Sequence, residues 1–272
     1  MIFHVTYFSG GLKVNGYLAL PNDLKVSLPQ LRNYFTGSVD QFAYSIIPQT
    51  KPLEEEKLPG FIYCRGGIGR FGRVKMNWIE KFASYGYVVF APCYRGNEGS
   101  EGRDEFGGRD REDVFSALRI MKGLPFVNQE KISIMGFSRG SINATQAAIT
   151  MANINKLVVW SGVSDLIKTY DERVDLRRMF KRVIGGTPRK LPHSYEERSP
   201  IHMVHQIQCP TLVIHGTKDE QVLVHHGENM FKTLKEFGKD VSYHRYEGYG
   251  HHFPAWVHDQ AVKKMFQWIE SQ

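Results

Sequence analysis

The stretch Ile132–Ala144, with the sequence ISIMGFSRGSINA, joins a β-rich run to a helical run of small residues through a G-x-S-x-G motif. The motif places Ser138 between Gly136 and Gly140. A serine on a sharp strand-to-helix turn projects its hydroxyl away from the backbone, and flanking glycines let neighbouring backbone approach without Cβ clashes. The backbone N–H that follows, on Arg139, then points toward a developing oxyanion at a helix N-terminus. The stretch therefore predicts a nucleophilic serine.

The sequence on both sides of this motif alternates between short apolar runs and segments of helical period. The apolar runs are GFIYC, YVVFAP, KISIMGF, KLVVWSG, PTLVIHG and VSYHRYEG. Between them, the segment DREDVFSALRIM has apolar residues at the spacing i, i+3, i+4, i+7, namely Val114, Ala117, Leu118 and Met121. This alternation predicts an α/β fold, with a mostly parallel twisted sheet of about eight strands and helices on both faces.

The length of 272 residues suits one large α/β domain, so we expect a single domain over residues 1–272. Residues 1–57 predict a hairpin around Ser9-Gly10-Gly11, then an edge strand near FAYSII and a loop. The interval 163–208 is far longer than a usual connection between elements. It predicts a cap-like insertion over the site; the alternative is an extra helix pair packed elsewhere on the surface.

A nucleophilic serine needs a base, and the base needs an orienting carboxylate. In a fold with this strand–serine–helix turn, the chain order is serine, acid, histidine. The run PTLVIHGTKDEQV supplies Asp219 just after a late strand, with Glu220 as its competitor. The run VSYHRYEGYGHHF supplies His251, with His252 as its competitor. Each element follows the C-terminal end of a predicted strand, where open α/β sheets place their sites, so we predict a triad of Ser138, Asp219 and His251.

A second motif, G-x-G-x-x-G at residues 67–72, follows the strand run FIYC and is typical of dinucleotide binding. The next strand run, YVVFAP, is followed by Cys93-Tyr94-Arg95-Gly96 and not by an acidic residue for the ribose hydroxyls. Arg95 can instead meet a 2′-phosphate. An NADP-dependent oxidoreductase is therefore one alternative, and a non-catalytic binding module is another; the hydrolase interpretation requires no cofactor.

Four motifs together resemble the catalytic domain of the prolyl oligopeptidase family of serine peptidases, within the α/β-hydrolase fold. They are CYRGNEGSEG, KISIMGFSRGS, CPTLVIHGTKDEQV and YEGYGHHF, and the resemblance runs from about Leu58 to the end of the chain. It implies that Ser138 is the nucleophile, Asp219 the orienting acid and His251 the base. It also implies that the Gly66–Gly67 loop helps to form the oxyanion hole, together with the Arg139 N–H.

The sequence departs from this family's pattern in three places. Arg65 stands before the two glycines where the family usually has Tyr or His, so the hole would rely on backbone N–H groups or on Arg65 itself. His252 stands where the family has a glycine after the catalytic histidine. The large propeller of the longer members is replaced by residues 1–57, which puts the family's size filter on peptide substrates in question.

The resemblance implies a peptidase, an acylaminoacyl-peptidase or an esterase that acts through an acyl-enzyme on short peptides or small esters. A carboxylesterase without peptidase activity is the alternative within this class. Arg65 and Arg95 lie at predicted strand ends, and we name them as candidates for binding an anionic group of the substrate. For Arg95 the family's Tyr-Arg-Gly motif favours a structural role that ties loops together.

Composition bounds the partners and the compartment. The net charge is +7, but Lys and Arg are interspersed with Asp and Glu, so we expect no nucleic-acid partner. No apolar run approaches the roughly 18 residues of a membrane span, so we expect no membrane partner. Three widely spaced cysteines and the lack of a signal-peptide pattern predict reduced thiols and a cytoplasmic protein. The oligomeric state is left open.

The histidines raise the question of a metal. Two adjacent pairs occur, His225-His226 and His251-His252. Adjacent residues on a helix or strand point in different directions, and no metalloprotease motif is present. We therefore expect no metal ligands in this chain.

Overall fold

The computed structural model describes residues 1–22, 24, 26–43 and 57–271. These residues form two compact units, and we describe each by itself. The first comprises Met1–Asp104, Arg109–Ile134 and Asn153–Asn155, and the second comprises Glu105–Gly108, Met135–Ala152 and Lys156–Gln272. The single domain over residues 1–272 therefore stays a prediction.

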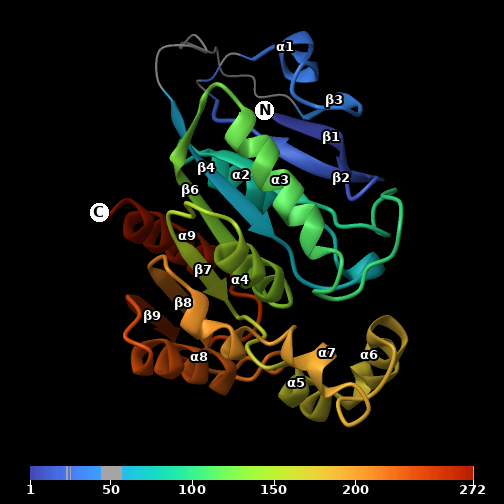
Figure 1. Ribbon diagram of the computed structural model, residues 1–272. Coiled ribbons are helices and arrows are strands. Elements are labelled where there is room, and N and C mark those ends of the chain that lie inside the picture. Colours follow the sequence, from blue (N-terminus) through green and yellow to red (C-terminus); the bar gives the residue numbers. More distant parts are fainter. Residues whose placement is uncertain (23, 25, 44–56, 272) are drawn as a thin grey trace. The chain divides into compact units, whose positions relative to one another are not determined.

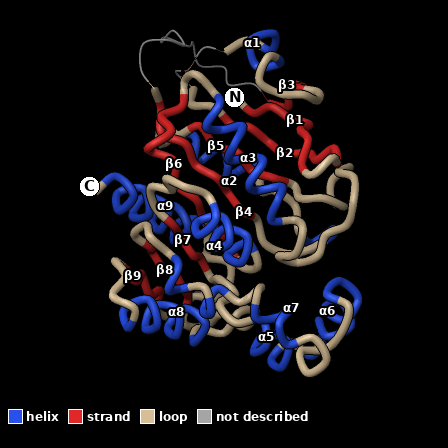
Figure 2. Tube along the Cα trace, in the orientation of Figure 1, coloured by secondary structure: helices blue, strands red, loops and turns tan. Residues whose placement is uncertain are grey.

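The described strands form a nine-stranded sheet in the order β3-β1-β2-β5-β4-β6-β7-β8-β9, and Figure 2 shows them in red. Together with the helices, this confirms the α/β class and the mostly parallel sheet expected from the sequence. The strands are β1 (Ile2–Ser9), β2 (Leu12–Ala19), β3 (Val39–Ala43), β4 (Leu58–Cys64), β5 (Val88–Pro92), β6 (Val127–Phe137), β7 (Leu157–Trp160), β8 (Thr211–Gly216) and β9 (Val241–Tyr246).

The antiparallel strands lie in the first unit. β1 and β2 form the expected hairpin, with Ser9 opposite Leu12. Gly10 and Gly11 make the turn at φ +56° and +82°, a region that glycine enters without a Cβ penalty. β1 also pairs with β3 and β2 with β5, both antiparallel, whereas β4 runs parallel to β5. The edge strand expected near FAYSII begins earlier, as β3, and residues 44–47 of that run lie outside the described residues.

Helices of the first unit pack their apolar residues inward. In α3 the four residues spaced i, i+3, i+4, i+7 are all fully buried, which confirms the predicted helical face. Figure 1 shows α3 on the near face of this unit's strands and α2 on the far face. The helices are α1 (Leu28–Arg32), α2 (Met76–Ala83) and α3 (Arg111–Gly123), with a short 3-10 turn η1 (Gly69–Phe71) between β4 and α2.

The second unit consists of parallel strands with helices on both faces. β8 pairs with both β7 and β9 in parallel, and all residues of β7 and β8 are buried. A strand covered on both faces needs a continuous apolar run, which explains LVVW and TLVI in the sequence. In Figure 1, α4 lies on the near face of these strands and α9 on the far face. The helices here are α4 (Gly140–Thr150), α8 (His225–Glu236) and α9 (Ala255–Glu270).

The interval 163–208 holds several short helices of the second unit. They are α5 (Leu166–Glu172), η2 (Val174–Leu176), α6 (Arg177–Ile184), α7 (Pro192–Glu196), η3 (Pro200–His202) and η4 (Val204–Gln206). The Phe180 ring of α6 packs edge-on against Phe106 at 5.2 Å between centroids. Gln146 of α4 donates its side-chain N–H to the carbonyls of Gly107 and Glu197 at 2.8 and 3.1 Å. The interval is thus helical and packed, and its role as a cap stays a prediction.

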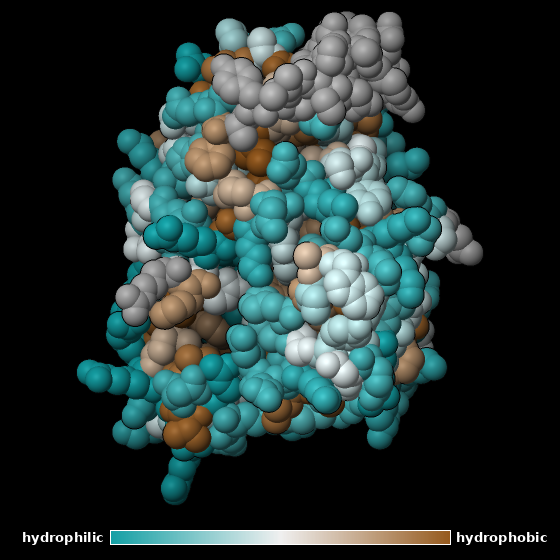
Figure 3. All heavy atoms as spheres, turned by 180° about the vertical axis from the view of Figure 1, so that it is seen from behind, coloured by the Kyte–Doolittle hydropathy of each residue, from teal (hydrophilic) through white to brown (hydrophobic). Residues whose placement is uncertain are grey.

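The face of the molecule seen in Figure 3 is mainly hydrophilic. Figure 3 shows one face of the molecule, where hydrophobic residues reach the surface in small patches among hydrophilic ones. Such scattered apolar exposure is normal for a globular protein. No helix in the described part of the chain has both the length and the hydropathy to cross a bilayer.

Packing of α3 against the strands gives a test of the fold. Leu118 is fully buried, so Leu118→Ala removes buried methyl groups and leaves a cavity. We expect a loss of about 2–5 kcal/mol in the free energy of unfolding, measured by urea denaturation. The matched control is Arg119→Ala on the exposed side of the same helix, which should change this free energy by less than about 0.5 kcal/mol. Equal losses in the two variants would contradict the assigned helical face.

Candidate active site

Ser138 sits in a strained backbone conformation between β6 and α4. Its φ is +56°, in the left-handed region that residues with a Cβ rarely adopt. The surrounding backbone holds it there: the Ser138 N–H donates to the Trp160 carbonyl at 2.9 Å, and the Ser138 carbonyl accepts from the N–H groups of Ser141 and Val163 at 3.1 and 3.2 Å. Strain that several contacts maintain together is typical of functional turns.

Gly136 has a steric reason to be glycine in this turn. A Cβ on Gly136 would overlap the backbone of Gly140 and Ser141 at the start of α4. The strand can therefore pass close beneath the helix only because this position has no side chain. The Ser141 hydroxyl also donates to the carbonyls of Ser138 and Val163 at 2.8 and 2.9 Å, which fixes the first turn of α4.

Asp219 and His251 meet through a buried hydrogen bond. Asp219 follows β8 and His251 follows β9, and His251 Nδ1 lies 2.8 Å from Asp219 Oδ2. The other carboxylate oxygen, Oδ1, accepts from the backbone N–H groups of Gln221 and Val222, each at 2.9 Å. Asp219 is 3% exposed and His251 7% exposed. An ionised carboxylate so placed orients the imidazole, with the proton on Nδ1 and a free lone pair on Nε2.

The competing residues occupy different environments. Glu220 is exposed, whereas Asp219 is buried. His252 is exposed too, and its ring stacks on Phe137 with the centroids 5.4 Å apart. The Asp219 carboxylate is therefore engaged by the first histidine of the pair and not by the second.

The Ser138 turn and the His251 ring come near each other through Phe137. The Phe137 and His251 rings lie 4.9 Å apart between centroids, and Phe137 directly precedes Ser138. Within the described residues, the Ser138 hydroxyl makes no hydrogen bond to either ring nitrogen of His251. Catalytic hydrogen bonds are often long before substrate binds, so the proton transfer between these two side chains stays a prediction.

A second histidine, His215, also contacts the Asp219 carboxylate. The sequence motifs did not predict this residue as part of the site. Its Nε2 lies 2.9 Å from the Val222 carbonyl and 3.4 Å from Asp219 Oδ2, so this nitrogen carries the proton. In the described part of the chain its Nδ1 has no hydrogen-bond partner, and a Cβ on Gly227 of α8 would come within 2.6 Å of it. The sequence offers one sign of this contact: His215 is a polar residue that directly follows the apolar run PTLVI.

The two histidines determine the charge of Asp219. Burial alone raises the pKa of this carboxyl, but hydrogen bonds from His215 and His251 outweigh burial and hold the pKa well below its usual range. Asp219 is therefore ionised across the neutral range. In a Ser-His-Asp triad, a fixed negative charge beside Nδ1 orients the imidazole and stabilises the imidazolium that forms during the reaction.

The remaining candidates concern the oxyanion hole and the binding of substrate. They are Arg139, Gly66, Gly67 and Arg65. In the second unit, the buried Arg139 guanidinium lies over the Phe106 ring, 4.9 Å from its centroid. In the first unit, the fully buried Arg65 donates to the carbonyls of Gly66 and Gly67, each at 3.1 Å, and to the Cys93 carbonyl at 2.6 Å. Arg65 thus braces the Gly66–Gly67 loop, and its role toward substrate stays a prediction.

Arg95 is also engaged by protein groups. Its side chain is buried and pairs with Asp113 at 2.7 Å, and it donates to the Ser9 hydroxyl at 3.3 Å. The Arg95 backbone N–H bonds the same carboxylate at 2.7 Å. These contacts tie the loop after β5 to α3 and to the first hairpin, as the structural alternative for Arg95 expects. Its contact with substrate stays a prediction.

The later glycines of the G-x-G-x-x-G motif have local roles. A Cβ on Gly72 would overlap the Arg65 guanidinium, and the Gly69 N–H donates to Asn97 Oδ1 at 2.9 Å. The loop continues into η1, and α2 begins only at Met76. A dinucleotide fold instead runs from its glycines directly into a helix whose N-terminus meets the pyrophosphate. The local structure therefore favours a loop braced by Arg65.

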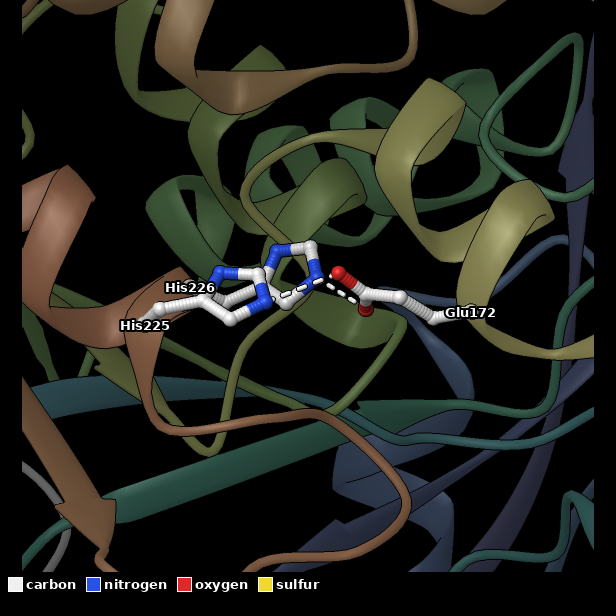
Figure 4. A group of neighbouring side chains, drawn as sticks. All are labelled: Glu172, His225 and His226. Carbon is white, nitrogen blue, oxygen red and sulfur yellow. Dashed lines mark hydrogen bonds and ion pairs between the residues drawn. The ribbon is translucent and has the colours of Figure 1, made fainter.

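The histidine pair at residues 225 and 226 differs from our expectation. The two rings stack with centroids 4.8 Å apart, and both Nε2 atoms face the Glu172 carboxylate (Figure 4). The argument that these adjacent side chains point in different directions is therefore wrong. The pair begins α8, and side-chain rotation brings the two ring tips together although their Cβ atoms diverge.

Comparison with known proteins identifies similar chains. Residues 74–272 match the prolyl oligopeptidase family. The uncharacterized peptidase YtmA of Bacillus subtilis is 41% identical over 272 residues, covering 100% of this chain and 94% of that protein. The uncharacterized peptidase YuxL of the same organism is 24% identical over 263 residues, covering 90% of this chain and 39% of that protein.

Solved structures share the fold at low identity. Pyrococcus horikoshii acylaminoacyl peptidase gives a TM-score of 0.76 at 20% identity, covering 98% of this chain and 41% of that chain. A puromycin hydrolase gives a TM-score of 0.77 at 19% identity, covering 98% of this chain and 38% of that chain. The present chain thus spans about two fifths of the length of these structures.

The contact between His215 and Asp219 gives a prediction. His215→Ala removes one charge-assisted hydrogen bond from the carboxylate that orients His251, so kcat should fall about 10-fold. His215→Gln keeps a donor in the same region and should recover part of the loss. The measurement is the pH profile of kcat on a chromogenic substrate of serine hydrolases. Equal kcat values and unchanged profiles for both variants would show that His215 plays no part in positioning Asp219.

The lowered pKa of Asp219 predicts how stability depends on pH. A carboxyl whose pKa is lower in the folded protein stabilises it above the unfolded pKa of about 4, and this contribution disappears as pH falls through the folded value. Between pH 5 and pH 2.5, the free energy of unfolding should therefore fall less steeply in Asp219→Asn than in the wild type. The control is Glu220→Gln, an exposed neighbour, which should follow the wild type. Parallel curves for Asp219→Asn and the wild type would refute the assignment.

Proposed function

Because the chain belongs to the prolyl oligopeptidase family, a family of serine peptidases, we propose that it cleaves short peptides or small esters with Ser138, His251 and Asp219 as its triad. The observation that supports this most strongly is the buried 2.8 Å hydrogen bond between His251 Nδ1 and Asp219 Oδ2. It supplies a base of fixed tautomer. The left-handed turn at Ser138 supplies the matching nucleophile.

The proposed acylation moves one proton and one leaving group. Ser138 Oγ attacks the substrate carbonyl carbon, and His251 Nε2 takes the hydroxyl proton. Asp219 remains ionised and stabilises the imidazolium through Nδ1. The tetrahedral intermediate collapses when His251 returns the proton to the leaving amine or alcohol, which leaves an ester on Ser138. Water then attacks the acyl-enzyme carbonyl while His251 takes a proton from it. His251 passes this proton to Ser138 Oγ, and the acid is released.

The oxyanion needs donors aimed at the developing charge. In the second unit, the backbone N–H of Arg139 follows Ser138 and opens α4, and we propose it as one donor. Donation by the Gly66–Gly67 backbone rests on the family resemblance. Arg65 supports this idea indirectly, because it donates to both carbonyls of that loop and so restricts the conformation of the loop.

The names of the relatives indicate which substrates to test first. The relatives in Bacillus subtilis carry the name peptidase, and the solved structures include acylaminoacyl peptidases and puromycin hydrolases. We therefore propose amide bonds of short peptides as the first substrates to test. A screen of aminoacyl and acylaminoacyl anilides beside p-nitrophenyl esters separates a peptidase from an esterase, since the triad is common to both. Turnover of esters alone would favour the carboxylesterase alternative.

Removal of the nucleophile tests the proposal. Ser138→Ala should abolish covalent labelling by a fluorophosphonate probe and lower kcat by roughly 10⁴-fold or more, because no acyl-enzyme can form. The matched control is Ser84→Ala, whose hydroxyl caps the end of α2 on the Lys81 carbonyl and should leave labelling unchanged. Full labelling of Ser138→Ala would overturn the proposed nucleophile.

A further inference from the structure

Three side chains outside the proposed triad converge on one point of the second unit. Glu172 ends α5, and His225 and His226 begin α8. His225 Nε2 lies 2.8 Å from Glu172 Oε1, and His226 Nε2 lies 3.1 Å from Glu172 Oε2. One potential ligand atom from each residue lies within 4.8 Å of the other two, and Figure 4 shows both ring tips directed at the carboxylate.

This set of donors has the chemistry of a zinc site. Two imidazole nitrogens with one carboxylate oxygen are a common three-residue set for Zn²⁺, with the fourth position left to water or another ligand. Ligand atoms around a tetrahedral Zn²⁺ lie about 3.4 Å apart, because each bond is about 2.1 Å long. The observed contacts, 2.8 Å to Oε1 and 3.1 Å to Oε2, join the two imidazoles to different oxygens of one carboxylate. One ligand atom from each residue lies within 4.8 Å of the other two, so small side-chain rotations bring three donors to the spacing that zinc needs.

Burial divides the roles of the two histidines. His226 is 1% exposed and lies in the interior, whereas the His225 side chain is 36% exposed and reaches solvent. His226 can thus anchor an ion while His225 closes over it from the solvent side.

The groups behind His226 allow a metal-binding tautomer. His226 Nδ1 lies 3.1 Å from the Ser164 hydroxyl and 3.3 Å from the Ser164 backbone N. Without a metal, Nδ1 accepts from Ser164 and Nε2–H donates to Glu172. With a metal on Nε2 the ring proton moves to Nδ1 and donates to the Ser164 hydroxyl, at the expense of the longer bond from the backbone.

We propose that Glu172, His225 and His226 form a Zn²⁺ site that joins α5 to α8. The site lies beside the loop that carries Asp219, because Arg173, the residue after Glu172, donates to the Gln221 carbonyl at 3.0 Å. An ion at this position would hold α5, near the start of the 163–208 interval, next to the loop that carries Asp219. The site takes no part in acyl transfer, so it stands or falls independently of the triad.

Zinc titration of the full chain tests the site. After treatment with a chelator, the wild type at pH 7.5 should take up ZnCl₂ in competition with a fluorescent chelator, at one strong site per chain. His225→Ala and Glu172→Gln should each lower the zinc affinity of that site by at least about 10-fold. Mutation of a residue that only hydrogen-bonds to a metal ligand already causes a loss of this size. His193→Ala, an exposed histidine on α7, is the matched control and should bind as the wild type does.

Two further measurements distinguish this site from adventitious binding to surface histidines. Saturating Zn²⁺ should raise the Tm of the wild type by roughly 5 °C and should raise that of His225→Ala by clearly less at the same zinc concentration. Co²⁺ in the wild type should give the visible absorption of four-coordinate Co²⁺, and Glu172→Gln should not. Equal zinc affinities in the wild type, His225→Ala and Glu172→Gln would overturn the proposal. The Ser138→Ala protein should bind zinc like the wild type, which separates this test from that of the triad.

Discussion

The left-handed backbone at Ser138 is the constraint around which the second unit is organised. A φ of +56° at a residue with a Cβ is unfavourable, so neighbouring elements must hold it. The Trp160 carbonyl at the end of β7 accepts from its N–H, and α4 closes on its carbonyl through Ser141. Gly136 removes the side chain that would keep strand and helix apart. A serine on such a turn projects its hydroxyl away from the backbone, and the start of a helix favours negative charge there.

A second constraint is the buried charge of Asp219. An ionised carboxylate in the interior is costly unless hydrogen bonds compensate it. Here two backbone N–H groups serve one oxygen, and His251 and His215 serve the other. The same contacts that stabilise the charge fix the orientation of His251, so folding and the proposed chemistry use one set of interactions. The loop that carries this charge also meets the end of α5 at Gln221, close to the Glu172 and histidine cluster.

The sequence predicted those features that depend on local patterns. Apolar runs and the i, i+3, i+4, i+7 spacing of α3 gave the α/β class, and the Gly10-Gly11 turn gave the first hairpin. The candidate site residues came from motif spacing and family resemblance, which say nothing about buried partners. The contact between His215 and Asp219 could not be predicted from the sequence, because it depends on how the loop after β8 folds back over that strand. The sequence does not predict that His225 and His226 converge. The directions of their Cβ atoms take no account of side-chain rotation at the start of a helix, and Glu172, which both rings contact, is distant in the sequence.

We propose that Ser138, His251 and Asp219 act as one unit. The most direct measurement is kcat for Ser138→Ala, for His251→Ala and for the double variant, with one substrate and at one pH. Residues of a single catalytic unit are not additive, because the loss of one member already disables the others. If the three side chains act as one unit, the double variant will be no slower than the slower single variant. Losses that multiply in the double variant would show that the two side chains act independently, and would contradict the proposed triad.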